Sequence, residues 1–374
     1  MVFDTVNQLR AQFWDETFWT PPNTTWTLYE DAGYRYFNDI FYSLYTSAVL
    51  ITIRLILTRL VYNPIGLICG LKATPRIPPP VPNAQLEAVF RKTKEKKCTL
   101  QNPQQLTALS KQFDISERYI QRWMRARLAQ TCPTVLTKFS ETCWRFTFYL
   151  VLFIYGLIIL WNKPWMWNSL YCFLEYPHHT VSSEEWWYYN VESAFYIGLI
   201  FSQFFDVHRK DFWLMFVHHF ITIILLSFSW ACNLVRIGTL VLVIHDFADI
   251  PLEFGKLLAY LKLKHQADIC LVVFALFWTV SRLIILPYRI IYYSSIVAPK
   301  LLPMFNAYYF FNGMLLMLQA LHFVWTYYIV VAAINTMSND TIRDMRSDDE
   351  FDDYDDDEED EEDEEEFDIK LKQN

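Results

Sequence analysis

The chain alternates long apolar runs with short polar breaks. Seven of the apolar runs are close to the roughly 20 residues that a helix needs to cross the hydrocarbon core of a bilayer. They span Phe37–Leu60, Glu141–Leu160, Trp187–Phe205, Phe212–Ala231, Ile237–Leu258, Asp268–Ile290 and Met304–Ile334. The pattern therefore predicts an all-α polytopic membrane protein with about seven transmembrane helices.

Polar segments divide the chain into five parts. We expect a luminal N-terminal segment at residues 1–36, a first transmembrane helix at 37–60, a cytosolic helical segment at 76–130, a bundle of six transmembrane helices at 138–336 and an acidic disordered tail at 337–374. Arg54 and Arg59 cluster at the far end of the first helix and mark that side as cytosolic. Seven helices then place the N terminus in the lumen and the C terminus in the cytosol.

Composition agrees with a membrane protein. Hydrophobic residues make up 53% of the chain and aromatic residues 18%, more than is usual in a soluble chain. The formal net charge of −9 comes from the acidic tail, and the remainder is basic. The seven cysteines show no C-x-x-C spacing, which argues against a disulfide scaffold and against a cysteine metal site. No cleavable signal peptide is expected, because the start of the chain lacks an apolar core.

Two consecutive predicted helices carry ionisable side chains: His218 and His219 in the first, and His245, Asp246 and Asp249 in the second. Such groups are costly inside membrane helices and usually face a protein interior or a water-filled cavity. Asp249 comes four residues after His245 and three after Asp246, so the three are expected to share one face, which Glu253 extends by a turn. The pattern predicts a buried reaction centre.

The two adjacent histidines differ in direction, because neighbouring residues on a helix point about 100° apart. We expect one of them to react, and favour His218. The other, His219, then lines the cavity or orients its neighbour. A structural alternative is a pair of hydrogen-bonded core histidines beside a structural His–Asp pair.

The order of the motifs in these helices resembles that of a known family. Two adjacent histidines are followed by N-x-x-R-x-G-x-L and then by H-D-x-x-D-x-x-x-E, all within Asp206–Glu253. Together with QRWMRARLAQ and FSETCWRFTFYL, this set resembles the ceramide synthases, within the TLC-domain membrane proteins, over about Leu100–Ala333.

The resemblance implies a TLC-type bundle of the last six helices around a central cavity. It also implies transfer of a fatty acyl group from acyl-CoA to the amine of a sphingoid base, sphinganine or sphingosine, to form dihydroceramide or ceramide. A histidine would take the proton of the amine or attack the thioester to form an acyl-imidazole. Asp246 or Asp249 would hold that imidazole or bind the ammonium group. Acyl-CoA is a substrate, and no cofactor or metal is expected.

Other polar residues are expected to bind the substrates: Arg209, Lys210, Arg236, Glu253, Arg282 and Asn312. Arg209 and Lys210 belong to a basic loop that would attract the phosphates of coenzyme A. For Arg282 and Asn312, which lie within the last two predicted helices, interhelical hydrogen bonding is an equal alternative.

The connection between the last two helices, Tyr292–Pro303, is expected to lie at the luminal end of the acyl tail. Its prolines and aromatic residues favour a fixed shape: Tyr292, Tyr293, Pro299 and Pro303. The resemblance links this loop to the choice of acyl-chain length. A simple connector is the alternative.

Residues 76–130 resemble the truncated homeobox-like segment of many animal ceramide synthases. Trp123, Arg125 and Arg127 match the third helix of a homeodomain, and there is little room for a full first helix. Ala126 stands where homeodomains have the Asn that reads adenine, so no specific nucleic-acid recognition is expected. A membrane-tethered structural or regulatory element is the expectation.

Two other function classes stay open at this point. His and Asp can bind zinc or iron, which would suit a metal-dependent lipid hydrolase or hydroxylase, although HxxxH and HxxHH boxes are absent. A non-enzymatic membrane-tethered regulator would rest on the homeobox-like segment.

The expected setting is the endoplasmic reticulum membrane. Asn23 and Asn339 both stand in glycosylation sequons, and only Asn23 is expected on the luminal side. Partners are expected to be acyl-CoA, a sphingoid base, membrane lipid and a second chain in a homo- or heterodimer.

Overall fold

The computed structural model describes residues 5, 8, 11–27, 39–75, 77–95, 103–206 and 211–339. Within these residues the regular structure is helical, as the sequence predicts, and they form two compact units. The described residues of the larger unit lie within Met1–Leu71 and Leu136–Arg346, and those of the smaller unit are 72–75, 77–95 and 103–135.

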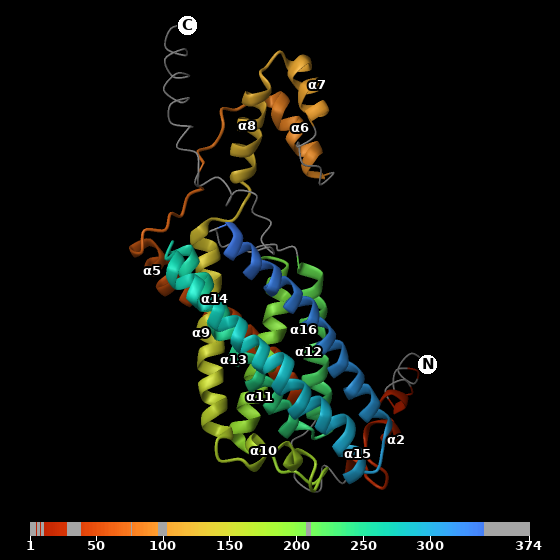
Figure 1. Ribbon diagram of the computed structural model, residues 1–374. Coiled ribbons are helices and arrows are strands. Elements are labelled where there is room, and N and C mark those ends of the chain that lie inside the picture. Colours follow the sequence, from red (N-terminus) through yellow and green to blue (C-terminus); the bar gives the residue numbers. More distant parts are fainter. Residues whose placement is uncertain are drawn as a thin grey trace. The chain divides into compact units, whose positions relative to one another are not determined.

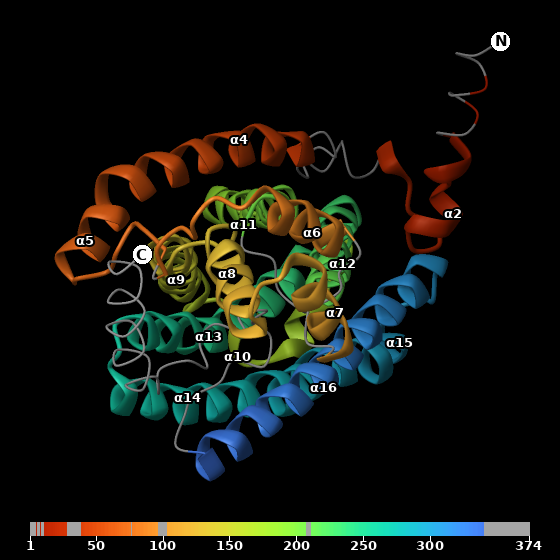
Figure 2. The ribbon, with the colours of Figure 1, turned by 90° about the horizontal axis from the view of Figure 1, so that it is seen from above.

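The larger unit is a bundle of long helices (Figure 1). They are α4 (Ile40–Leu57), continued by η2 (Thr58–Tyr62) and α5 (Asn63–Ile68); α9 (Val135–Leu160); α11 (Ser183–Gln203); α12 (Phe212–Ala231); α13 (Val235–Tyr260); α14 (Lys264–Trp278), continued by η4 (Thr279–Val297) and α15 (Ala298–Leu301); and α16 (Asn306–Asn339). Figure 2 shows α4 beside α11 on one side of the bundle, and α14 with α16 on the other.

Five helical stretches of the described chain are long and apolar enough to cross a membrane. They span Ile40–Ile68, Val135–Leu160, Phe212–Ala231, Lys264–Leu301 and Asn306–Ile334. The chain is therefore a multi-pass membrane protein. Helices α11 and α13 are also long but carry buried polar side chains, among them Glu192 and Asp246. The total of seven spans stays a prediction.

Short elements gather at one end of the bundle: α2 (Glu16–Trp19), α10 (Pro164–Trp167), η3 (Ser169–Cys172) and α15 (Figure 1). Arg289 of η4 reaches this end and donates to the carbonyl oxygen of Met166 at 2.9 Å. Helix α12 begins at the opposite end, next to Asp211. We refer to these two ends as the α10 end and the Asp211 end.

The core of the bundle is strongly aromatic. Phe148 of α9 and Phe195 of α11 stack with ring centroids 3.6 Å apart. Tyr189 lies so close to Gly238 of α13 that a Cβ at this glycine would come within 2.2 Å of the tyrosine hydroxyl. The hydroxyl of Tyr189 also hydrogen-bonds with Ser229 of α12. A larger residue at position 238 would therefore force the Tyr189 ring to move.

Two predicted helix ends are wrong, and both errors involve proline. The first membrane helix does not end at Leu60 but continues to Ile68, and Pro64 follows directly on the π-helical turn η2 inside this continuous helix. The expected loop Tyr292–Pro303 is helical up to Leu301. Helix η4 carries Pro287 inside it, which helices packed among neighbouring membrane helices tolerate.

The smaller unit contains three helices: α6 (Ala84–Glu95), α7 (Pro103–Phe113) and α8 (Glu117–Ala129). Helix α6 has 12 residues, and whether it corresponds to the first helix of a homeodomain stays a prediction. Leu86 of α6, Leu106 of α7 and Ile120 of α8 pack into one buried cluster.

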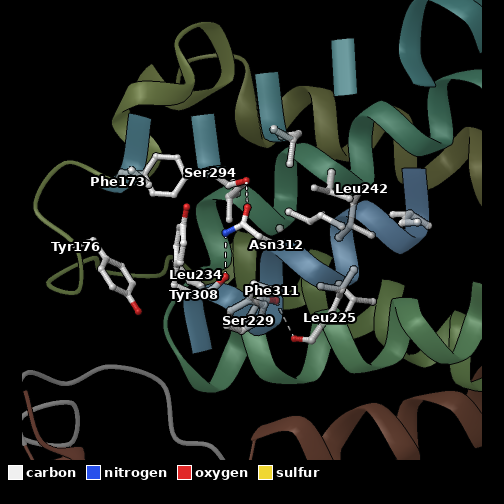
Figure 3. Close-up of a pocket in the computed structure, with 18 of the residues that line it drawn as sticks. Phe173, Tyr176, Leu225, Ser229, Leu234, Leu242, Ser294, Tyr308, Phe311 and Asn312 are labelled. Atoms are coloured by element: carbon white, nitrogen blue, oxygen red, sulfur yellow. Dashed lines mark hydrogen bonds between the residues drawn. The ribbon is translucent and has the colours of Figure 1, made fainter. Parts of the chain in front are cut away.

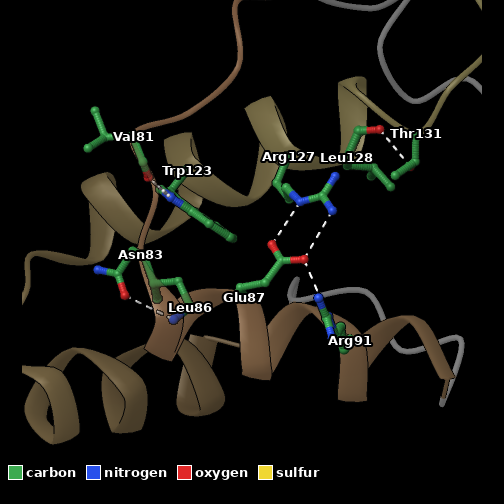
Figure 4. Close-up of polar contacts among 9 residues, drawn as sticks. All are labelled: Val81, Asn83, Leu86, Glu87, Arg91, Trp123, Arg127, Leu128 and Thr131. Atoms are coloured by element: carbon green, nitrogen blue, oxygen red, sulfur yellow. Dashed lines mark hydrogen bonds and ion pairs between the residues drawn. The ribbon is translucent and has the colours of Figure 1, made fainter.

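Polar contacts also join α6 to α8 (Figure 4). Arg127 of α8 donates two hydrogen bonds to Glu87 of α6, at 2.8 and 3.0 Å. The Arg127 guanidinium lowers the pKa of Glu87. Trp123 donates to the carbonyl oxygen of Val81 at 2.7 Å. Ala126 is buried and offers no group that could read a base.

Candidate active site

The predicted histidines and aspartates converge in the half of the bundle nearer the Asp211 end. His218 lies against Trp325 of α16, with ring centroids 5.2 Å apart, and beside Tyr196 of α11 at 6.4 Å. His219 also contacts Tyr196, at 6.0 Å, and is buried. The two adjacent histidines thus share one aromatic neighbour on α11, although they point in different directions.

His245 lies on α13 and is held by its own helix. Its Nδ1 is 2.7 Å from the carbonyl oxygen of Val241. A carbonyl only accepts, so Nδ1 carries the proton in the neutral ring and Nε2 presents a lone pair. Nε2 is buried and has no hydrogen-bond partner among the described residues. This leaves one imidazole nitrogen available to a substrate.

A further histidine completes the cluster. His322 of α16 has its ring centroid 5.2 Å from that of His245 and 5.6 Å from that of Trp278. It is almost fully buried. The structure brings His322 to the predicted centre.

Asp249 pairs with an arginine. The guanidinium of Arg282, on η4, is 3.2 and 3.3 Å from the two carboxylate oxygens of Asp249. The same Arg282 nitrogen donates to the backbone carbonyl of His245 at 2.7 Å, and the guanidinium lies over Trp278. Arg282 therefore ties η4 to the segment of α13 that carries the His–Asp motif.

Asp246 faces a residue that sequence reasoning missed. Its carboxyl group lies beside that of Glu192 on α11, and both side chains are 0% exposed. Among the described residues no hydrogen-bond donor reaches any of the four carboxyl oxygens. Two buried carboxylates side by side repel each other, so the pair requires a shared proton or a bound cation. The sequence did contain a signal for Glu192, because this residue is a charged group inside a predicted helix long enough to cross a membrane.

Charged groups continue from Asp249 toward the Asp211 end. Glu253 pairs with Lys256 at 2.6 Å. Arg54 of α4 pairs with Asp206 at 2.6 Å. Arg209 and Lys210, predicted to bind coenzyme A, lie outside the described residues.

Arg236 lies at the α10 end, away from the cluster of His218, His219, His245 and His322. It donates to the carbonyl oxygen of Tyr171 at 3.0 Å and its guanidinium lies over Trp165. Its neighbour in the motif, Asn233, adopts a positive φ of 56° between α12 and α13. Asn233 donates to the carbonyl oxygens of Pro177 and His179. Asn233 and Arg236 are the Asn and Arg of the N-x-x-R part of the motif. Their contacts hold the loop after α10 in place.

The same loop holds a neutral histidine. Burial lowers the pKa of His179 to about 4. The ring nitrogen Nε2 is 2.7 Å from the carbonyl oxygen of Leu174 and donates to it. This histidine is part of the loop's own hydrogen bonding and is not a further reactive group.

An apolar cavity leads from the histidine cluster to the α10 end (Figure 3). Its empty space amounts to about 970 Å³, which includes space open to the outside. Tyr196 and His245 line it near the cluster, and Phe173, Leu302 and Phe305 line it at the α10 end. A long apolar group could extend through it with its reactive end at His245.

Asn312 is the main polar side chain midway along this wall, and protein groups bind it. Its Oδ1 accepts hydrogen bonds from Ser294 and Ser295, each at 2.8 Å. Its Nδ2 donates to the carbonyl oxygen of Tyr308 at 2.9 Å. Figure 3 shows the contacts of Asn312 with Ser294 and Tyr308. Asn312 thus joins η4 to α16. This is the interhelical hydrogen bonding that the sequence offered as the alternative to substrate binding.

The predicted chain-length segment contributes to the cavity through other residues than those singled out. Ser294, Ala298 and Leu302 line the cavity. Tyr292 is 45% exposed on the outer face. Tyr293, Pro299 and Pro303 are not part of the lining. The helical periodicity of this segment, hidden by its prolines, decides which residues face inward.

No group of three or more His, Cys, Asp or Glu side chains in the described part of the chain is arranged to hold a metal ion. Asn23, the predicted glycosylation site, has a positive φ of 65° and an exposed side chain. The side chain of Asn339 is not among those described.

Comparison with known proteins identifies the family to which the helical bundle belongs. The family model of the TLC domain matches residues 138–331. Ceramide synthase 5 of Mus musculus is 39% identical over 352 residues, which cover 93% of this chain and 84% of the relative. Ceramide synthase 3 of Homo sapiens is 37% identical over 343 residues, covering 90% and 88%. The chain therefore belongs to the TLC-domain proteins and, among them, to the ceramide synthase family.

Proposed function

We propose that this protein is a ceramide synthase, an acyl-CoA-dependent sphingosine N-acyltransferase. The relatives, about as long as this chain, are named ceramide synthases. The observation that carries the proposal is the apolar cavity that His245 lines at one end, close to His322. A long acyl chain fills such a cavity, and the reactive carbonyl then lies at the imidazoles.

The chemistry requires one proton transfer and one acyl transfer. The sphingoid amine loses a proton, its nitrogen attacks the thioester carbonyl, the new C–N bond forms and the C–S bond breaks. The thiolate of coenzyme A leaves and takes up a proton. A histidine near neutral pKa suits the proton transfer.

The alternative route has a covalent intermediate. An imidazole nitrogen attacks the thioester, coenzyme A leaves, and the amine then attacks the acyl-imidazole to give the amide and free histidine. We propose His218 as the reacting residue, because its Nδ1 is buried without a hydrogen-bond partner among the described residues. His245, which lines the cavity, is then the proton acceptor. Intact mass after incubation with acyl-CoA alone should reveal an acyl adduct that is missing in His218→Ala; its absence in the wild type would favour direct attack by the amine.

Coenzyme A enters from the Asp211 end in this proposal. It is polyanionic and stays in water, whereas the acyl chain enters the bundle. Lys262 and Lys264 are exposed at this end and attract the phosphates. We further propose that this end faces the cytosol, that the α10 end faces the lumen and that the membrane is that of the endoplasmic reticulum.

Purified protein incubated with sphinganine and acyl-CoA tests the function. We expect N-acylsphinganine and free coenzyme A in equal amounts, with the same rate in the presence of a chelator. A rate that a chelator abolishes and zinc restores would point to a metal enzyme. No turnover with any acyl-CoA would contradict the proposal.

A further inference from the structure

The N-terminal segment before α4 carries a small folded unit rich in aromatic residues. We call residues Phe13–Trp26 the aromatic cap. Trp19 donates from its indole to the carbonyl oxygen of Phe13 at 2.6 Å, and Trp26 donates to that of Trp14 at 3.0 Å. The carboxylate of Glu16 accepts the backbone N–H of Trp26 at 2.9 Å. These contacts fold the segment back on itself around α2.

The aromatic cap packs on the α10 end of the bundle through Trp19. The Trp19 side chain is 3% exposed. It stacks on Phe228 of α12 with ring centroids 4.6 Å apart and an angle of 9° between the rings. It also meets Phe310 of α16 edge-on at 5.7 Å. The cap therefore bridges α12 and α16 at the end remote from the histidines.

The residues on which the cap packs belong to the wall of the cavity. Trp19 shares one buried cluster with Tyr176, Phe305 and Phe311, and these three line the cavity. On α12, Leu225 and Ser229 face the cavity, while Phe228 faces Trp19. A single layer of side chains thus separates the aromatic cap from the α10 end of the cavity.

We propose that the aromatic cap limits the depth of the cavity and so sets the longest acyl chain that the enzyme uses. This inference rests on the proposed ceramide synthase function. The acyl chain extends from the histidines toward Phe305, and its end meets side chains that Trp19 and Phe228 hold in place. Each methylene that the cavity accepts or rejects changes the relative use of two acyl-CoAs by about fourfold.

The test compares products from a mixture of acyl-CoAs of increasing chain length, with sphinganine in excess. Trp19→Ala and Phe228→Ala remove the support of the wall. For each variant we expect the ratio of the product two carbons longer than the wild-type optimum to the optimal product to rise about fivefold or more. Trp167→Ala is the matched control, because Trp167 lies at the same end, is 59% exposed and stays outside the cavity lining. It should keep the wild-type ratio.

A cap that only stabilises the fold would give another result. Total activity would then fall in Trp19→Ala and Phe228→Ala while the product ratio stayed within about twofold of wild type, and this would overturn the inference. Should Trp19→Ala fail to accumulate, Trp19→Leu keeps an apolar side chain of smaller volume and must still shift the ratio toward longer chains. Wild-type protein that makes no N-acylsphinganine would contradict the proposed function itself, a result distinct from an unchanged ratio.

Discussion

The carboxyl pair of Asp246 and Glu192 is the least expected feature among individual residues. Both groups are fully buried, and the described residues supply no hydrogen-bond donor to either. Uncompensated charge in such a place is expensive, so the pair holds a proton or a cation such as the ammonium group of a sphingoid base. Asp246 directly follows His245 on α13, and Glu192 lies one helical turn before Tyr196 on α11. His245 and Tyr196 both line the cavity.

Glu192→Gln tests whether this pair takes part in turnover. The amide keeps the shape of the carboxyl group but removes one negative charge and the shared proton, so we expect kcat to fall about a hundredfold, within the usual range for a lost acid–base group. The thermal midpoint of the purified protein should change by only a few degrees. Glu184→Gln, at an exposed position on the same helix, is the control and should keep wild-type kcat. Wild-type kcat in Glu192→Gln would show that the pair is structural.

Asp249 illustrates a second kind of residue, one whose main partner is an opposite charge. Removing its charge leaves Arg282 buried without compensation, which typically costs about 3–5 kcal/mol of stability. We expect Asp249→Asn to lower the thermal midpoint strongly. The double variant Asp249→Asn with Arg282→Met should regain a large part of that stability, because no unpaired charge then remains. A double variant that is less stable than Asp249→Asn alone would contradict the assigned role.

Sequence reasoning located most of this centre because ionisable residues stand out within apolar runs. His218, His219, His245 and Asp246 are found this way, and the structure brings them together. It could not assign partners, because Arg282 and Glu192 lie on other helices and nothing in their spacing indicates which carboxylate each one meets. Arg236 was grouped with the substrate residues for the same reason, although its contacts hold a loop at the α10 end.

Among the elements, the continuous helix from α14 through η4 to α15 has the largest effect on the cavity. Prolines suggested a loop from Tyr292 to Pro303, whereas the helix ends only at Leu301 and the break covers about four residues. The sequence could not predict this, because proline ends helices in water but is tolerated among packed membrane helices. The consequence is a helical pattern in which Ser294 and Ala298 face the cavity.

Ala298→Phe should therefore shorten the cavity from this helix. The added ring projects into the space at the α10 end, and we expect the product distribution to move toward shorter acyl chains by about fourfold per methylene excluded. Tyr292→Ala, on the exposed face of the same helix, should leave the distribution unchanged. Mass spectrometry of products from mixed acyl-CoAs measures both. A shift in Tyr292→Ala with none in Ala298→Phe would place chain-length selection on the outer face.

At the scale of the whole molecule, the two ends of the bundle differ in chemistry. The α10 end is aromatic and carries the aromatic cap, and the Asp211 end is charged. The apolar runs of the sequence predicted the helices well. The cavity among the helices was expected from the resemblance to the ceramide synthases. The aromatic cap could not be predicted, since aromatic residues in a polar segment give no indication of the surface on which they pack.

This asymmetry leads to a topological prediction. If the α10 end faces the lumen, Asn23 within the aromatic cap carries a glycan and Asn339 at the far end of α16 does not. Glycosidase treatment of protein from eukaryotic cells should increase the mobility of the wild type and of Asn339→Gln, and leave Asn23→Gln unchanged. A glycan on Asn339 would place the end of α16 in the lumen and contradict the orientation.

The central claim is that the buried histidine cluster transfers an acyl group to a sphingoid amine, and the rate of amide formation tests it most directly. Wild type, His218→Ala and His178→Ala are purified in detergent and incubated with sphinganine and acyl-CoA, and N-acylsphinganine is quantified by mass spectrometry. His178 is the matched control, because it is exposed in the loop at the α10 end. We expect wild type and His178→Ala to turn over at similar rates and His218→Ala to form no product above background, while it unfolds at a similar temperature. Wild-type turnover by His218→Ala would contradict the account.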